Sequence, residues 1–298
     1  MSYCLCNYNV PVKICQTIAE MRAASRAARQ EGRRLGFVPT MGALHAGHIS
    51  LVRAARQQCD SVAVSIFVNP TQFGPKEDFS KYPRTFERDR ELLEAEGVAI
   101  LFAPSTEEMY PPGATTFVIV EGLSEKLCGR SRPGHFRGVA TVVAKLFNIV
   151  EPDLAFFGQK DSAQAVIIRR MVRDLAFDVE IVVCPIVREP DGLALSSRNA
   201  YLDPRQRKQA TVLYRSLMRV QGLADRGESD SARLIAAALD VFKEVPEVRL
   251  DYFEIVDRET LDPVADISQG ALVAVAGFVG STRLIDNVVL PGAGAAKG

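Results

Sequence analysis

Apolar runs of strand length alternate with segments of helical periodicity over the first 186 residues. The clearest run, at 61–68, is rich in β-branched residues and has the composition of a central strand. After residue 48, Ile49, Val52 and Ala55 recur on one face of a helix. The pattern predicts strands at 35–38, 61–68, 98–103, 116–120, 154–157 and 179–184, and helices at 48–58, 83–96, 139–150 and 162–173.

Strands and helices in this alternating order predict an α/β fold in which helices cover both faces of a parallel sheet. Ligands of such sheets bind beyond the carboxyl ends of the strands, where the strand order reverses. Polar loops follow residues 38, 68, 157 and 184, each at a predicted carboxyl end. We therefore expect these four loops to meet at one cleft.

The pattern changes after about residue 187. Asp203 followed by Pro204 predicts a helix N-terminus, and one long helix is expected to continue to about residue 224. Helices followed by strands predict a smaller α+β unit with an antiparallel sheet. We therefore expect two domains, 1–186 and 187–298. The remaining expected elements are a helix at 231–244 and strands at 248–256, 271–279 and 283–290.

Charge and cysteine usage narrow the class of protein. The 298 residues contain 36 basic and 36 acidic side chains, which argues against a broad nucleic-acid surface. No apolar run approaches the ~18–20 residues of a membrane span, and the first ten residues do not have the pattern of a signal peptide. Six cysteines without a CxxC pair favour a reducing cytoplasm. We expect a cytoplasmic protein with no membrane or nucleic-acid partner, buried thiols at Cys59 and Cys184, and a loose tail around Cys4 and Cys6.

Two of the three histidines, His45 and His48, lie three residues apart in a glycine-containing turn at 39–48. A strand, a glycine turn and a helix N-terminus present backbone N–H groups to an anion. Histidines add donors that can become cationic, so this turn suits nucleotidyl transfer, in which an α-phosphate is attacked and pyrophosphate leaves. Two other interpretations stay open: the pair could cap the helix, or it could form a three-histidine metal site with His135.

Asn69 and Gln72 follow the predicted central strand in the stretch 69–74. Their neutral amides contain both donors and acceptors, which suits the hydroxyl and carboxylate of a hydroxy acid. The alternative is an ordinary Asn-Pro turn without a ligand.

Two further stretches contain residues that suit phosphate. Lys160 lies where a helix N-terminus is predicted, and a cation is disfavoured there unless an anion is present. Ser196, Ser197 and Arg198 form a phosphate-gripping set, although the chain has no P-loop and no GxGxxG fingerprint. A surface lysine and a solvated turn are the plainer alternatives. The arginine- and glycine-rich loop at 128–138 is either anion-binding or solvated.

Five motifs in order resemble the pantoate–β-alanine ligases, also called pantothenate synthetases, over nearly the whole chain. They are PTMGALHAGH at 39–48, SIFVNPTQFGPKEDFSKYPRT at 65–85, RPGHFRGVATVVAKLFNIVEPDLAFFGQKD at 132–161, LSSRNAYL at 195–202 and STRLIDN at 281–287. The resemblance implies a Rossmann-like parallel sheet domain of the nucleotidyltransferase type, a smaller C-terminal domain and a homodimer.

The resemblance also implies a reaction. ATP and pantoate would give pantoyl-adenylate and pyrophosphate, and β-alanine would then displace AMP to give pantothenate. Mg²⁺ would arrive with ATP, with no metal held by the protein itself. The implied catalytic residues are His48, His45, Lys160 and Arg198, with His48 as the proton donor, and Gln72 and Gln164 would bind pantoate. The implied ATP contacts are Met41, Gly42, Ala43, Leu44, His45, Ala46, Gly47, His48, Gly158, Gln159, Lys160, Asp161, Val187, Leu195, Ser196, Ser197 and Arg198.

One residue departs from the family motif, in which Met usually precedes Ser-Ser-Arg; here it is Leu195, which has a similar volume. A water-sensitive acyl-adenylate implies a loop that closes over the site, and residues 73–82 are the candidate. Two rival functions stay open. One is a metal hydrolase that uses His45, His48 and His135, and the other is a module that binds nucleotide without catalysis.

Overall fold

The computed structural model describes residues 11–75 and 77–292. Its first part contains a six-stranded sheet whose paired strands are all parallel, in the order β1-β4-β3-β2-β5-β6. These strands are β1 (Lys13–Cys15), β2 (Leu35–Thr40), β3 (Ser61–Ile66), β4 (Ile100–Phe102), β5 (Leu154–Gly158) and β6 (Glu180–Cys184). The helices between them are α1 (Ile18–Gln30), α2 (Ala46–Gln58), α3 (Phe86–Ala95), α4 (Thr106–Met109), α5 (Cys128–Ser131), α6 (His135–Val150) and α7 (Ser162–Asp174).

The strand order reverses beside β2. From β2 the chain moves through β3 to β4 on one side, and it returns to β5 on the other side of β2. A crevice opens where the order reverses, at the carboxyl ends of the two strands. Short 3₁₀ turns mark the neighbouring strand ends, namely η1 (Pro70–Gln72) after β3 and η2 (Gln159–Asp161) after β5. The predicted cleft therefore lies at the reversal between β2 and β5.

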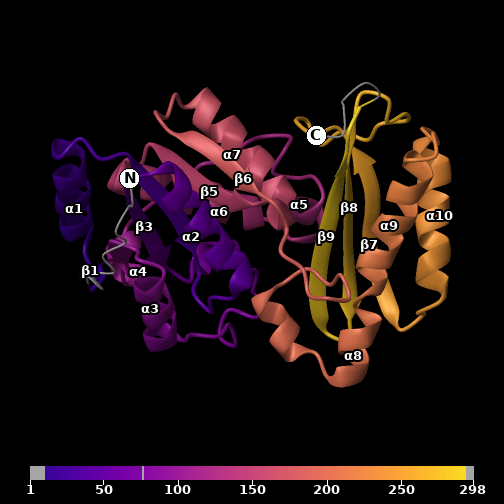
Figure 1. The fold of residues 1–298 in the computed structure, drawn as a ribbon, viewed down its shortest axis with the longest axis horizontal. Helices are drawn as coiled ribbons and strands as arrows, with labels where there is room; N and C mark the ends of the chain where they lie inside the picture. The colour runs from indigo at the N-terminus through magenta and orange to yellow at the C-terminus, as the bar shows by residue number, and fades with distance from the viewer. Residues whose placement is uncertain (1–10, 76, 293–298) are drawn as a thin grey trace, which may run out of the picture.

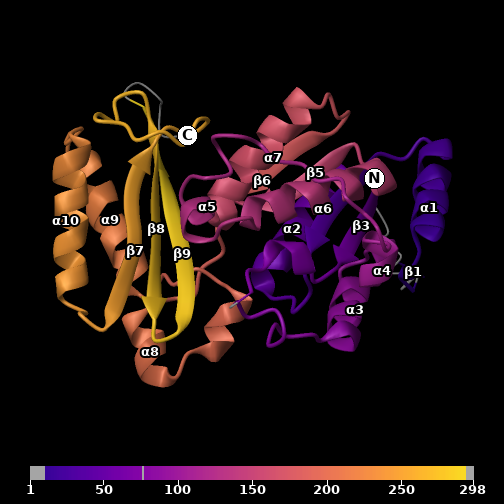
Figure 2. The same ribbon diagram turned by 180° about the vertical axis from the view of Figure 1, so that it is seen from behind.

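A second sheet, within residues 248–290, lies beside the first. Strands β7 (Val248–Val256), β8 (Ala271–Val279) and β9 (Thr282–Leu290) pair antiparallel, and β9 lies nearest the parallel-sheet part (Figures 1 and 2). Helices α9 (Val212–Ala224) and α10 (Ser231–Lys243) cover the outer face of this sheet (Figure 1). The short helix α8 (Pro204–Gln209) and the 3₁₀ turn η3 (Ser197–Tyr201) connect the two parts.

Alternate residues of the parallel strands face two different cores, as the period of a strand requires. Leu35 and Phe37 of β2 pack with α1, α6 and α7, whereas Val38 packs on the other face with α2 and α3. The first of these cores continues into the antiparallel sheet, because its buried residues include Tyr252, Val256, Leu261, Leu272, Ala274 and Ala276. The two sheets therefore share one hydrophobic core. The expected α/β class with a smaller antiparallel sheet is confirmed.

Two predicted elements are wrong. Residues 116–120 pair with no strand in the described part of the chain, because the Val118 N–H donates to the Thr141 hydroxyl at 2.9 Å instead. The long helix expected from 204 to 224 is two helices, α8 and α9. At the break, the Thr211 hydroxyl donates to the Lys208 carbonyl at 2.8 Å, and such side-chain bonds compete with helical ones.

The prediction also missed β1, α1, α4 and α5. The first turn of α1 contains a recognisable signal, since Thr17 and Glu20 form a capping box in which each side chain accepts from the other's backbone N–H. Cys184 is buried as expected, whereas Cys59, the C-cap residue of α2, is only half-buried. The expected loose tail around Cys4 and Cys6 lies outside the described residues. No helix in the described ranges is long and apolar enough to cross a membrane.

Candidate active site

The two histidines form a reciprocal cap at the start of α2. His45 is the N-cap residue, and its Nδ1 accepts a hydrogen bond from the Gly47 N–H at 3.1 Å. The Nδ1 of His48 accepts from the His45 N–H at 3.3 Å. Because each Nδ1 is an acceptor, the proton of each neutral ring lies on Nε2. A Cβ atom at Gly47 would lie 2.9 Å from the His45 ring, so a larger residue there would displace that ring.

Both rings are neutral near pH 7. Burial, followed by the Lys160 ammonium, lowers the pKa of His45 to about 4. Burial, followed by the adjacent His45 ring, lowers the pKa of His48 to about 3. The pair thus offers two Nε2–H donors at a helix N-terminus, where an anion is favoured. A bound phosphate would raise both pKa values, because a nearby negative charge stabilises the cationic ring.

The third histidine has the opposite tautomer. His135 contacts the Gln72 carbonyl through Nδ1 at 2.9 Å and the Arg132 guanidinium through Nε2 at 3.0 Å. A carbonyl only accepts and a guanidinium only donates, so the His135 proton lies on Nδ1. Burial, followed by the Arg132 charge, lowers the pKa of this ring to about 4. With both nitrogens occupied, His135 does not complete a three-histidine metal site.

These assignments predict the nitrogen NMR spectrum of the histidine side chains. The chain has three histidines. At pH 7 we expect three neutral rings, with Nε2–H in His45 and His48 and Nδ1–H in His135. None should titrate between about pH 5.5 and 8, because their pKa values of about 4, 3 and 4 lie below that window. Two-bond nitrogen–proton correlation spectra report the tautomers directly, and a ring that titrates near its ordinary pKa would contradict the arrangement.

A buried carboxylate, which the sequence analysis did not identify, holds the turn before His45. Asp89 of α3 accepts from the backbone N–H groups of Ala43 and Leu44 at 2.8 and 2.9 Å. The turn places Gly42 and Ala43 at φ values of +77° and +50°, in the left-handed region. Without a carboxylate to accept their N–H groups, Ala43 and Leu44 would leave buried donors unpaired, and that is costly.

The side-chain amides of Asn69 and Gln72 are positioned by a close contact between η1 and α6. The Nδ2 of Asn69 donates to the Gln72 side-chain oxygen at 3.2 Å and to the Gly138 carbonyl at 3.1 Å. The Gln72 amide nitrogen is thereby left facing Met41, whose sulfur lies 2.8 Å away. A Cβ atom at Gly138 would lie 2.3 Å from the Thr71 carbonyl oxygen, so only glycine lets η1 approach α6 this closely.

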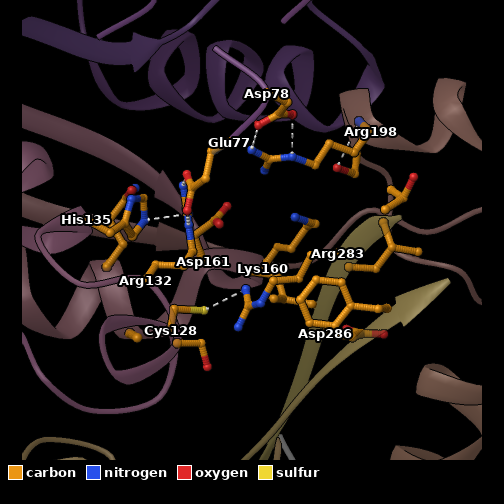
Figure 3. Close-up of a pocket in the computed structure, with 18 of the residues that line it drawn as sticks. Glu77, Asp78, Cys128, Arg132, His135, Lys160, Asp161, Arg198, Arg283 and Asp286 are labelled. Atoms are coloured by element: carbon orange, nitrogen blue, oxygen red, sulfur yellow. Dashed lines mark hydrogen bonds and ion pairs between the residues drawn. The ribbon is translucent and has the colours of Figure 1, made fainter. Parts of the chain in front are cut away.

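The basic side of the site combines an unpaired lysine with two paired arginines. The ammonium group of Lys160 forms no hydrogen bond or ion pair with any residue that the structure describes. Arg198, by contrast, donates two hydrogen bonds to Asp78 at 3.0 and 3.1 Å, and Arg132 pairs with Glu77. Figure 3 shows both carboxylates reaching these arginines from one segment of chain. The expected closing loop is thus attached to the site by two ion pairs.

The side chains meet in a cavity of about 230 Å³ at the strand-order reversal. A neighbouring cavity of about 800 Å³, shown in Figure 3, extends toward β9 and shares its lining at Lys160, Asp161 and Gln164. One wall of the smaller cavity is apolar and comes from α6, a contribution that the sequence analysis did not anticipate. The apolar wall consists of Val139, Val142, Val143 and Leu146, with Phe157 beside them.

Most of the expected site residues line the smaller cavity. They are Met41, His45, Gly47, His48, Gln72, Gly158, Lys160, Asp161, Gln164, Val187, Leu195, Ser196, Ser197 and Arg198. Gly42, Ala43, Leu44, Ala46 and Gln159 do not line it; the first four shape the histidine turn, and the Gln159 side chain turns toward β9. Asn69, Tyr82, Arg132 and His135 line the cavity too, although the family resemblance gave them no ligand.

Comparison with known proteins identifies the family. The family model described as pantoate-beta-alanine ligase matches residues 13–289. The pantothenate synthetase of Koribacter versatilis is 63% identical over 287 residues, which cover 96% of this chain and 99% of that protein. A crystal structure of pantothenate synthetase from Thermus thermophilus matches with a TM-score of 0.88 at 52% identity, covering 93% of this chain and 99% of that one.

A third relative has been solved as a complex with ligands. The pantoate-beta-alanine ligase of Francisella tularensis, solved as a complex with beta-gamma ATP and beta-alanine, matches with a TM-score of 0.78 at 34% identity. The match covers 93% of this chain and 97% of that one. Together with the family model and the site geometry, these likenesses extend over the parallel sheet, the cavity and the antiparallel sheet alike. The chain belongs to the pantoate–β-alanine ligase family.

Proposed function

We propose that this chain condenses pantoate with β-alanine at the expense of ATP, through a pantoyl-adenylate. The observation that carries the proposal is one cavity of about 230 Å³ lined by His45, His48, Lys160 and both glutamines, Gln72 and Gln164. Phosphate-binding and acid-binding groups thus face the same space. The family comparison supports the same reaction.

The chain's own residues provide charge stabilisation for the first step. A pantoate carboxylate oxygen attacks the α-phosphorus, and the bond to the β-phosphate breaks as pyrophosphate leaves. His45 and His48 donate through Nε2–H toward the phosphates, and Lys160 adds a positive charge beside them. Preorganised donors of this kind act most strongly where charge develops in the transition state. In the second step the β-alanine amine attacks the acyl carbon, loses a proton, and AMP leaves.

The acid subsite combines two amides with the apolar wall of α6. Gln72 lines the cavity; its amide oxygen accepts from Asn69, and its amide nitrogen points at the Met41 sulfur. Gln164 lines the same cavity, and no residue that the structure describes hydrogen bonds with its amide. Two such amides suit the hydroxyl and carboxylate of pantoate, and the valines of α6 suit its two methyl groups.

The residues also fit a magnesium ion that arrives with ATP. The described residues contain no cluster of three or more His, Cys, Asp or Glu side chains able to hold a metal ion. Mg²⁺ typically binds through substrate phosphates and one or two carboxylates, and Asp161 offers a carboxylate on the wall of both cavities. Bound there, the ion would neutralise part of the triphosphate charge.

A pyrophosphate-release experiment without β-alanine tests the proposed function. With ATP, Mg²⁺ and pantoate we expect one pyrophosphate per active site in a rapid-quench burst, followed by a slow leak, because the adenylate waits in a site from which water is excluded. Adding β-alanine should then restore steady turnover. A control without pantoate should show no burst.

Other outcomes would indicate other functions. ATP binding without any pyrophosphate would favour a nucleotide-binding module. Pyrophosphate release that needs no pantoate but is lost on removal of a transition metal would favour a hydrolase. Release only in the presence of all three substrates would replace the two-step mechanism with a concerted one.

We further propose a cytoplasmic homodimer with domains at 1–186 and 187–298, the first of them Rossmann-like. The support for dimerisation is the segment around residue 117. Phe117 and Ile119 are 45% and 52% exposed, and residues 116–120 pair with no strand in the described part of the chain. Exposed apolar side chains that lie close together on a surface are typical of a protein–protein contact.

A further inference from the structure

Two adjacent residues of β9, Asp286 and Asn287, connect the two turns that face the triphosphate in the proposed function, one directly and one through an arginine. The side chain of Asn287 is almost completely buried, although β9 belongs to the antiparallel sheet. Its Nδ2 donates to the backbone carbonyls of Gln159 and Lys160 at 2.9 and 3.0 Å. Its oxygen accepts from the Gln159 amide at 2.9 Å. Asn287 therefore uses both donors and its acceptor on the turn that carries Lys160.

Asp286 reaches the other turn through an arginine. Arg188 donates to both Asp286 oxygens at 2.6 and 3.0 Å, and also to the Gly192 carbonyl at 3.0 Å. Arg188 lies in a hairpin in which Val187 accepts from the Leu195 N–H at 3.0 Å. Residues 196–198 follow directly after Leu195. The Asp286–Arg188 pair therefore holds the hairpin from which this phosphate-binding stretch extends.

We propose that Asp286 and Asn287 are positioning residues that set the distance between the two phosphate-binding turns, and that Asn287 acts through Lys160. Both side chains act through protein partners: Asp286 accepts from Arg188, and Asn287 bonds with the turn at Gln159 and Lys160. The inference rests on the proposed ATP site, because it assigns Lys160 to the triphosphate. By bonding to the carbonyls of Gln159 and Lys160, Asn287 fixes the backbone from which the Lys160 side chain extends. Catalytic groups tolerate little misplacement.

The test replaces Asn287 with its isostere, Asn287→Asp. This change puts a carboxylate against two carbonyl oxygens and removes both donors. We expect ATP binding, measured by calorimetry without pantoate, to weaken roughly tenfold. The reason is that a displaced Lys160 ammonium makes a weaker charge-assisted hydrogen bond with the triphosphate. The matched control is Asn148→Asp, an exposed asparagine of α6 whose amide donates to the Ala144 carbonyl and which lies outside the site; it should bind ATP normally.

A double-mutant cycle separates positioning from general loss of structure. If Asn287 acts through Lys160, then Asn287→Asp should weaken ATP binding and slow adenylation in the wild-type background but add little in a Lys160→Ala background. Additive effects in the two backgrounds would overturn the proposal. So would normal ATP binding and normal kcat in Asn287→Asp.

Two further variants keep the test decisive. If Asn287→Asp does not fold, Asn287→Ala removes the donors without adding charge, and Gln159→Leu removes the reciprocal bond without touching β9. Both should weaken ATP binding in the same direction, and normal binding in both would overturn the proposal. Because calorimetry with ATP alone needs no pantoate, failure of the proposed reaction would show separately, as an absent pyrophosphate burst in the wild-type protein.

Discussion

His48→Ala is expected to slow pantoate-dependent pyrophosphate release by about 10²–10³-fold, the usual cost of removing one donor from a site that stabilises developing charge. The Nε2–H of His48 is available to a ligand, because its Nδ1 accepts from the backbone N–H of His45. Alanine removes that donor and also leaves the His45 N–H without its acceptor. Rapid-quench assays under saturating ATP and pantoate measure the rate of the first step.

The matched comparison is His48→Gln, which retains a side-chain amide donor at a similar distance from the backbone. We expect it to recover part of the rate that His48→Ala loses. Circular dichroism and the thermal midpoint should show that both variants fold. Release by His48→Ala at the wild-type rate would remove His48 from the catalytic groups.

Lys160→Ala should have an effect of similar size, again about 10²–10³-fold on adenylation, because it removes a cation that stabilises the reacting phosphates. The ammonium group has no protein partner among the described residues, and Lys160 lines both cavities; Figure 3 shows its place in the larger one. Its charge already acts on the site, since it contributes to the lowered pKa of His45. Single-turnover measurements separate the loss in chemistry from the loss in ATP affinity.

Two controls sharpen this second experiment. Lys160→Arg should recover only part of the rate, because a planar guanidinium does not reproduce the geometry of a compact ammonium. Lys243→Ala removes an exposed lysine of α10 that pairs with Asp240, far from the cavity, and should leave the rate unchanged. If Lys160→Ala adenylates pantoate normally, Lys160 does not face the triphosphate.

Much of the fold could be predicted from the sequence, because its strongest signals are local. The β-branched run after Ser61 and the apolar stripe of α2 each reflect the face that the element buries. The errors arise where one side chain overrides a local pattern. Residues 116–120 have strand composition, but Thr141, 23 residues further along, takes the Val118 N–H. No periodicity within the segment could have revealed that partner.

The candidate site, too, has parts with local sequence signals and parts that depend on long-range contacts. The stretches around His48, Gln72, Lys160 and Arg198 could be recognised because they place unusual polar residues in loops that follow predicted strands. The residues that hold those stretches could not be recognised in this way. Asp89 acts on a turn 45 residues before it, and Asn287 acts on a turn 128 residues before it. The pairing of Arg198 with Asp78 likewise depends on how the chain folds back on itself.

The shared hydrophobic core has a consequence for how this chain can be recombined with its relatives. Tyr252 and Leu272 of the antiparallel sheet pack in the same core as α6 and the parallel sheet. A chimera could join the first 186 residues of one relative to the remainder of another. Its hydrophobic core and its active-site lining would then both combine residues from two different proteins. We therefore expect a stable chimera only from two relatives whose side-chain volumes match across that interior.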